Sequence, residues 1–178
     1  MLTRWPLPDL AVLEGRRPKP FDPHRLLHEL VRADVDFVLV GGLAEVLHGA
    51  PYDTDDVDIV LRTPDALAPL AAVLTMLDAR VIDADDQDGL GLEWTPELLA
   101  TAERLPFVTD AGRLDLIGAP GFGQRTLAEV ETEQLVLGDL AVCVASLDWL
   151  IAAKDASPSR VHRRMVPTLL ALRDEIQG

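Results

Sequence analysis

Residues 37–61 constrain most strongly what this chain can fold into. They form an apolar run that ends in two glycines, a short segment of helical pattern, and a second apolar run that opens with aspartates. The first run, Phe37 to Val40, is apolar and rich in β-branched residues, which favours a buried strand. The sequence therefore predicts two core strands joined through a glycine turn and a short helix.

The glycine pair at Gly41 and Gly42 indicates a ligand contact. Glycine has no Cβ, so the backbone can turn sharply here and approach a ligand closely. A helix that begins at Leu43 directs its free N–H groups and the positive end of its dipole at the same place. The turn is therefore predicted to seat a phosphate group.

Asp56 and Asp58 open the second apolar run. They lie two residues apart on a predicted strand, so both side chains leave the same face. Ionising both carboxylates at that spacing costs free energy unless a cation lies between them. Mg²⁺ suits such a place, because it takes oxygen ligands and prefers a few carboxylates together with substrate phosphates. The chain has no dinucleotide or P-loop fingerprint, no zinc-ligand spacing and no nucleophile elbow.

This order and spacing resembles the nucleotidyltransferase superfamily related to DNA polymerase β. The AbiEii-like, abortive-infection branch, whose members include type IV toxins, is the closer match. Its pattern runs from Gly-Gly through a helix to Gly-x-x-Arg-x-Thr-x-Asp-hydrophobic-Asp, and Tyr52 stands where that pattern has arginine. The matching residues are Gly41, Gly42, Gly49, Thr54, Asp56 and Asp58. The resemblance implies an α/β (α+β) nucleotidyltransferase fold, with a mixed β-sheet flanked by helices and with C-terminal helices.

Two later positions extend the resemblance. Asp115 lies in an alternating strand pattern, on the face opposite Leu114 and Leu116, and resembles the third carboxylate of the superfamily. The alternative is a solvent-facing aspartate on an edge strand. Lys154 ends a Ser-x-x-x-Leu-Ile-x-x-Lys stretch that the AbiEii-like branch also carries, although the Lys-Asp pair that follows there is missing here. The alternative for Lys154 is an ordinary lysine on a solvated helix face.

The resemblance also implies a division of roles. Asp56 and Asp58 would hold two Mg²⁺ ions, or Mn²⁺, and Asp115 would join one metal and help to deprotonate the attacking hydroxyl. The nucleoside triphosphate would be bound by four residues: Gly41, Gly42, Thr54 and Lys154. Displacement of pyrophosphate in line is the two-metal scheme.

The formal net charge of −14 argues against a general nucleic-acid binder, because phosphate contacts supply most of that affinity. It leaves room for RNA at one local basic patch. Arg160, Arg163 and Arg164 form the densest such cluster beyond the N-terminal arm and are candidate acceptor contacts. The alternative is that these arginines neutralise carboxylates on the last helix.

Length and patterning predict one domain with an appendage. The expected parts are an N-terminal arm over residues 1–20, a nucleotidyltransferase core over 21–145, and C-terminal helices over 146–178 packed on the core. The last helix, over 161–176, should bend or split at Pro167. No apolar run is long enough to cross a membrane and no signal peptide is visible, so we expect a cytoplasmic protein with no membrane partner.

These observations predict a metal-dependent enzyme that transfers a nucleoside monophosphate to an RNA (tRNA) or protein acceptor. It would be a toxin of a type IV toxin–antitoxin system, with a cognate antitoxin as partner. One alternative is a binding or regulatory module that keeps the fold without catalysis. Another is transfer to a small molecule of the aminoglycoside type, because an acidic surface suits a cationic acceptor.

Overall fold

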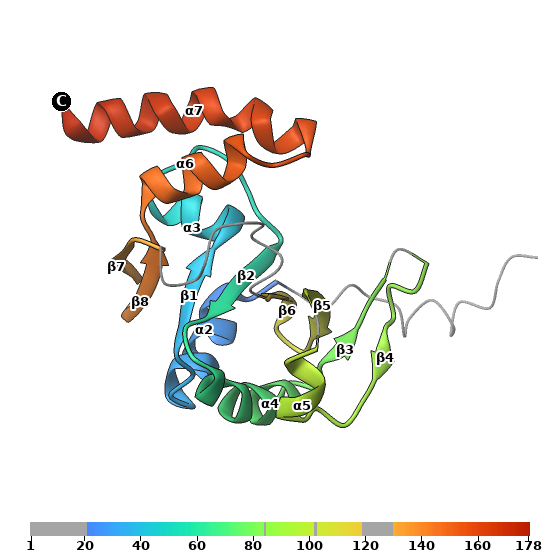
Figure 1. Cartoon of the computed structure of the whole chain (residues 1–178). Helices are drawn as coiled ribbons and strands as arrows, with labels where there is room; N and C mark the ends of the chain where they lie inside the picture. Colours follow the sequence, from blue (N-terminus) through green and yellow to red (C-terminus); the bar gives the residue numbers. More distant parts are fainter. Residues whose placement is uncertain (1–20, 84, 102, 119–129) are drawn as a thin grey trace, which may run out of the picture.

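The computed structural model describes residues 21–83, 85–101, 103–118 and 130–178 (Figure 1). The expected arm at residues 1–20 lies outside this part. The described chain forms an eight-stranded sheet in the order β4-β3-β5-β6-β2-β1-β8-β7. The strands are β1 (Phe37–Val40), β2 (Asp56–Leu61), β3 (Arg80–Val81), β4 (Leu90–Gly91), β5 (Arg104–Thr109), β6 (Gly112–Ile117), β7 (Thr132–Leu137) and β8 (Leu140–Ala145).

The sheet is mixed, as expected. β1 pairs with β2 in antiparallel fashion and with β8 in parallel, and β2 pairs in parallel with β6. The remaining pairs, among them the β5–β6 and β7–β8 hairpins, are antiparallel. The central position of β2 places its aspartates in the middle of the sheet, with β6 on one side and β1 on the other.

Helices flank this sheet. They are α2 (Pro23–Arg32), α3 (Gly41–Leu47), the 3-10 turn η1 (Pro64–Ala66), α4 (Leu67–Met76), α5 (Pro96–Leu99), α6 (Leu147–Asp155) and α7 (Arg160–Gln177). The expected start of α3 at Leu43 was two residues late, because the helix is bounded at Gly41, whose own φ of +67° forms the turn out of β1. Of the bend or split expected at Pro167, the split was wrong, because α7 continues through this residue as one helix. The bend stays a prediction.

The main core lies between α2, α4 and the sheet. Val57 and Ile59 of β2 are fully buried, and their register partners on β6, Leu114 and Leu116, point to the same side. Fully buried leucines of α2 and α4 belong to the same apolar cluster. Alternation along a strand then sends Asp56 and Asp58 to the opposite face, away from this core.

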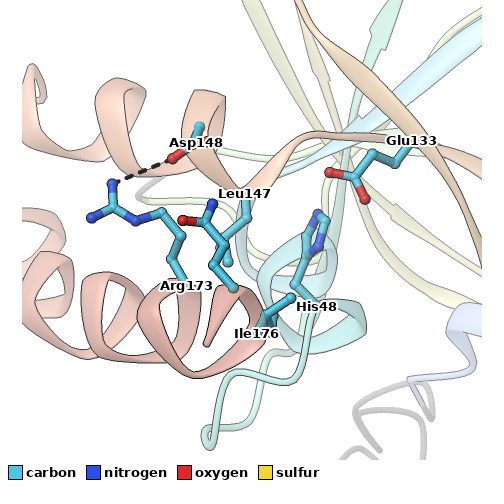
Figure 2. A pocket seen from close by; sticks show the side chains of 7 residues that line it. His48, Glu133, Leu147, Asp148, Arg173 and Ile176 are labelled. Carbon is cyan, nitrogen blue, oxygen red and sulfur yellow. Dashed lines mark hydrogen bonds and ion pairs between the residues drawn. The ribbon is translucent and has the colours of Figure 1, made fainter.

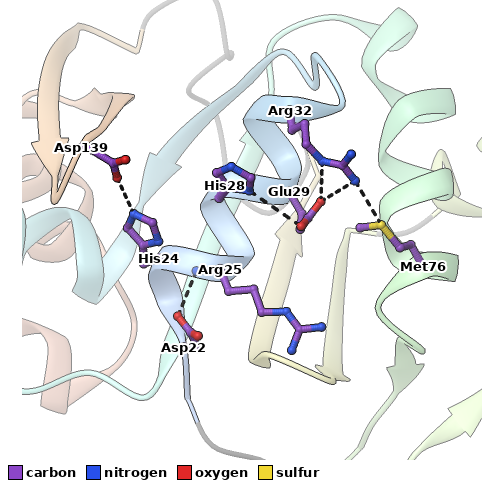
Figure 3. Close-up of polar contacts among 8 residues, drawn as sticks. All are labelled: Asp22, His24, Arg25, His28, Glu29, Arg32, Met76 and Asp139. Atoms are coloured by element: carbon purple, nitrogen blue, oxygen red, sulfur yellow. Dashed lines mark hydrogen bonds and ion pairs between the residues drawn. The ribbon is translucent and has the colours of Figure 1, made fainter.

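Polar contacts fix the position of α2 on its exposed side (Figure 3). The Asp22 carboxylate caps the helix by accepting from the Arg25 backbone N–H at 2.9 Å. His24 Nε2 lies 2.9 Å from the Asp139 carboxylate in the β7–β8 turn. Arg32 lies 2.8 Å from Glu29 one turn earlier on the same helix. The His24–Asp139 pair joins α2 to the β7–β8 turn, whereas the other two contacts lie within the helix and its cap. Such exposed pairs contribute little stability individually.

The C-terminal helices form a second layer (Figure 1). Trp149 and Leu150 of α6 join the main core, while Leu147 and Ile151 face a smaller cluster with Leu169 of α7. Leu169 and the half-buried Val166 hold α7 on α6 around Pro167, and this packing offsets the hydrogen bond that the proline cannot make. In the described residues no helix combines the length and apolar character needed to cross a membrane.

Candidate active site

Three carboxylates meet on the face of the sheet opposite the main core. The parallel register of β2 and β6 places Asp58 directly beside Asp115, and Asp56 lies two residues earlier on the same face. One ligand oxygen from each of the three aspartates lies within 4.8 Å of the others. Asp115 is 5% exposed on an interior strand, so the alternative of a solvent-facing aspartate at a sheet edge was wrong.

The cluster carries a high electrostatic cost. Burial, followed by the negative charges of Asp56 and Asp115, raises the pKa of Asp58 to about 7. Burial also raises the pKa of Asp115, although its contacts with Arg104 oppose this shift. A carboxyl that resists ionisation at neutral pH marks a place where a bound cation would be strongly favoured.

The residues present fit a divalent metal ion. All three side chains offer hard oxygen ligands, and they come from rigid, hydrogen-bonded strands rather than from loops. Mg²⁺ and Mn²⁺ prefer such carboxylate ligands, with the remaining positions filled by water and phosphate. Asp56, Asp58 and Asp115 are thus suited to hold the metal that the sequence predicts.

The glycine turn is built against this cluster. Gly41 has φ +67°, a backbone conformation that favours glycine, and a Cβ added there would lie 2.6 Å from Cγ of Asp58. A Cβ on Gly42 would lie 2.8 Å from the hydroxyl oxygen of Thr54. That hydroxyl donates to the Asp56 carboxylate at 3.0 Å. Gly41 therefore lies against Asp58, and Gly42 lies against Thr54, which in turn contacts Asp56. The phosphate seat itself stays a prediction.

Substitution of Gly41 by alanine should disrupt the carboxylate cluster. The new methyl group would overlap the Asp58 side chain, and alanine would be strained at this φ, so we expect a loss of about 2–4 kcal/mol in stability. Metal binding should be lost as well. Gly49→Ala is the matched control, because Gly49 has φ +108° but its Cβ would meet Leu172 at an ordinary 3.5 Å. Urea unfolding and Mn²⁺ titration of both variants test this, and equal effects on metal binding would contradict the contact.

Lys154 lies in a buried polar group. Its ammonium is 2.5 Å and 2.7 Å from the two carboxylate oxygens of Glu45, whose side chain is only 2% exposed. The Tyr52 hydroxyl donates to the same carboxylate, and burial together with Glu45 raises the tyrosine pKa. The alternative of a lysine on a solvated helix face was therefore wrong. Lys154 is also near enough to Asp58 to lower that carboxyl's pKa.

Two residues of this region were missed by sequence reasoning. Glu45 sits in an otherwise apolar helical segment, and this buried acid was the signal that could have been used. Arg104 begins β5 and donates through Nε to Asp115 Oδ2 at 2.9 Å, with a second contact from its terminal nitrogen. No local pattern indicates this pair, because it depends on the register of the β5–β6 hairpin.

The arginine cluster lies at the start of α7, and a separate hollow has none of the three aspartates in its lining. Arg160 and Arg164 are exposed at the start of α7, and Arg163 donates to the backbone carbonyl of Ser157. The hollow lies at the end of α3 opposite the glycine turn (Figure 2). There His48 Nε2 is 2.9 Å from the Ala145 carbonyl oxygen, which explains the histidine as a link between α3 and β8.

Comparison with known proteins supports this description of the fold. No protein-family model matches the sequence, and no curated protein matches it. The lincosamide antibiotic adenylyltransferase LnuA, bound to lincomycin, is similar in structure with a TM-score of 0.58 at 12% identity, over 84% of this chain and 94% of that chain. ANT(2'')-Ia in complex with adenylyl-2''-tobramycin is similar with a TM-score of 0.52 at 16% identity, over 86% of this chain and 94% of that chain.

An antigenic nucleotidyltransferase-like protein from Paracoccidioides brasiliensis gives a TM-score of 0.51 at 18% identity, over 86% of this chain and 78% of that chain. The chain has the nucleotidyltransferase fold. Identities this low show the fold alone. Membership of the AbiEii-like branch remains a prediction, as do the division at residue 145 and the roles of individual residues.

Proposed function

We propose that this nucleotidyltransferase-fold protein is a metal-dependent nucleotidyltransferase. The observation that carries the proposal is the gathering of Asp56, Asp58 and Asp115 within 4.8 Å, beside a glycine turn that no larger residue can form. Three carboxylates at this density destabilise one another in the absence of a cation. Their mutual repulsion lowers the stability of the fold, whereas the same arrangement suits a metal ion with phosphate ligands.

The chain's residues have distinct roles in this proposal. Asp56, Asp58 and Asp115 would hold the metal ions, which neutralise phosphate charge and lower the pKa of the acceptor hydroxyl. The backbone at Gly41 and Gly42 would approach the triphosphate, with Thr54 orienting Asp56. Lys154, with two of its three N–H groups directed at Glu45, would offer the third to phosphate. Asp115 would take the proton of the attacking hydroxyl.

The favoured acceptor is a small molecule with a hydroxyl group. Two structural neighbours are antibiotic complexes: LnuA is bound to lincomycin, and ANT(2'')-Ia is in complex with adenylyl-2''-tobramycin. The net charge of −14 favours a cationic or neutral acceptor over a polyanion. The nucleoside triphosphate that the reaction requires supports the cytoplasmic location expected from the sequence.

Two other candidate functions are each favoured by one observation. Transfer to RNA or protein, as a type IV toxin with a cognate antitoxin, is favoured by the exposed arginines Arg160 and Arg164 at the start of α7. A binding module without catalysis is favoured by the cations already paired at the site, Arg104 on Asp115 and Lys154 on Glu45.

The test is a transfer assay with each α-³²P-labelled nucleoside triphosphate and Mg²⁺ or Mn²⁺. Separate reactions contain an aminoglycoside and lincosamide panel, total tRNA, or a protein extract. Labelled antibiotic is the expected product, and labelled tRNA or protein would support the toxin candidate instead. Triphosphate binding measured by calorimetry without transfer to any acceptor would favour the binding module.

The stability of the metal-free protein should depend on pH in an unusual direction. The pKa of Asp58 is raised in the folded protein to about 7 from 3.8. A raised pKa contributes stability that is fully present below pH 4 and is lost as the pH rises through 7. In EDTA the Tm should therefore fall between pH 5 and pH 8, apart from the contributions of other groups.

Saturating Mg²⁺ should remove most of this fall, because the metal takes the place of the proton. Differential scanning calorimetry over this pH range, with EDTA and with Mg²⁺, provides the measurement. The Asp58→Asn variant isolates the contribution of this carboxyl. If Tm falls with pH equally steeply in the variant and in the parent, the pH dependence does not come from Asp58.

A further inference from the structure

Arg104 is the second cationic side chain in contact with the carboxylate region, and it differs from Lys154 in how firmly it is held. The Asp115 side chain is 7% exposed, but that of Arg104 is 60% exposed. Both contacts of Arg104 go to the single oxygen Oδ2 of Asp115. Lys154, by contrast, is 11% exposed and is bound to both oxygens of a buried glutamate. Because the Arg104 side chain is already mostly exposed to solvent, it can leave Asp115 without first being brought out of a buried position.

The strand register explains why Arg104 reaches Asp115. β5 runs antiparallel to β6, with Arg104 opposite Ile117 and Pro106 opposite Asp115. Arg104 and Asp115 are thus diagonal neighbours on the same face, a spacing that a long side chain can bridge. Arg113 lies on this face too, opposite Asp56, but its guanidinium contacts Gln87 and makes no contact with the three aspartates among the described residues.

We propose that Arg104 occupies Asp115 while the site is free of nucleotide and transfers to phosphate when the triphosphate binds, so that nucleotide and metal binding are coupled through this residue. The proposal rests on the proposed function. It makes Arg104 a positioning residue that controls when Asp115 is available as a ligand.

The competition follows from charge. A guanidinium that neutralises Asp115 lowers the affinity of this carboxylate for a metal ion, and the metal and the guanidinium repel each other. The guanidinium fork also matches phosphate geometry and is weakly hydrated, so a triphosphate offers it an equally good partner. If the triphosphate draws Arg104 from Asp115, it raises the metal affinity, and by thermodynamic linkage the metal raises the triphosphate affinity by the same factor.

The first measurement is Mn²⁺ binding to the free, full-length protein by electron paramagnetic resonance. Arg104→Gln should bind Mn²⁺ about tenfold more tightly than the parent, the order expected for removing one nearby, partly screened charge. Arg104→Lys keeps the charge without the fork and should lie between the two. Arg113→Gln is the matched control, because it removes a positive charge from the same sheet face without touching Asp115, and it should change the affinity less than threefold.

The second measurement repeats the Mn²⁺ titration with a saturating non-hydrolysable triphosphate. The triphosphate itself supplies metal ligands, so affinity should rise in every variant. The rise should be about tenfold smaller in Arg104→Gln than in the parent and in Arg113→Gln. This difference between variants isolates the part of the coupling that runs through Arg104.

The outcomes separate this inference from the proposed function. If the parent binds neither Mn²⁺ nor triphosphate, the proposed function fails. If the parent binds both and Arg104→Gln binds Mn²⁺ with equal or weaker affinity, the inference is overturned, and Arg104 merely supports Asp115. Circular dichroism of each variant checks the fold, and Arg104→Lys carries the test if Arg104→Gln does not fold.

Discussion

Asp58→Asn should abolish nucleotidyl transfer and at the same time stabilise the metal-free protein at neutral pH. Asparagine has nearly the same shape but cannot supply the charge that holds a divalent ion, so transfer should fall on the order of 10³-fold or more. Asp56→Asn combined with Asp58→Asn should leave the fold intact and reduce transfer to background. Undiminished metal-dependent transfer in the double variant would remove these residues from the site.

The gain in stability has a separate cause. In the parent protein at pH 8 the folded state must hold an ionised Asp58 beside Asp56 and Asp115, which its pKa of about 7 shows to be unfavourable. The neutral amide removes that cost. We expect about 2 kcal/mol of stabilisation in EDTA, less than the full shift in pKa implies because the site is partly open to solvent. The gain should disappear near pH 4, where the carboxyl is protonated.

Asp55→Asn is the control for both measurements. Asp55 is exposed and adjacent in sequence, so this variant changes the net charge equally without changing the cluster. Transfer and urea unfolding in EDTA should both resemble the parent. Loss of activity together with higher stability is the combination expected of a metal ligand, whereas a purely structural aspartate would lose stability when replaced.

Lys154→Met should destabilise the protein by about 3–5 kcal/mol, because it leaves the Glu45 carboxylate buried without its cation. Glu45 is 2% exposed and Lys154 donates to both of its oxygens. Only Tyr52 would remain as a partner of this carboxylate in the described structure. Urea unfolding at pH 7 provides the measurement, with Tm as a second readout.

The double variant Glu45→Gln with Lys154→Met should recover more than half of that loss, because no unpaired charge then remains. Arg32→Met is the exposed control: it breaks the ion pair with Glu29 and should cost less than about 1 kcal/mol. Glu45→Gln is also measured alone, and if the losses of the two single variants simply add in the double variant, the pair is not coupled. Triphosphate titration of the double variant then reports the contribution of Lys154 to nucleotide binding apart from folding.

Local patterns in the sequence indicate several of the elements. Asp22 before Pro23 indicated the start of α2, and its side chain does cap that helix. Ser146 likewise caps α6 through the Trp149 N–H. The alternating pattern around Asp115 indicated a strand, and β6 (Gly112–Ile117) contains it. These features depend on residues a few positions apart, so they can be recognised without the fold.

The sequence by itself determined the glycine turn, the aspartate pair of β2 and the superfamily resemblance, because each is a pattern of neighbouring residues. Only the tertiary structure decided that Asp115 joins Asp58 across the β2–β6 register, that Arg104 reaches the same carboxylate from β5, and that Glu45 holds Lys154, 109 positions away along the chain. The physical reason is that local preference acts over a few residues, whereas strand register and helix packing are set by burying the whole apolar surface at once.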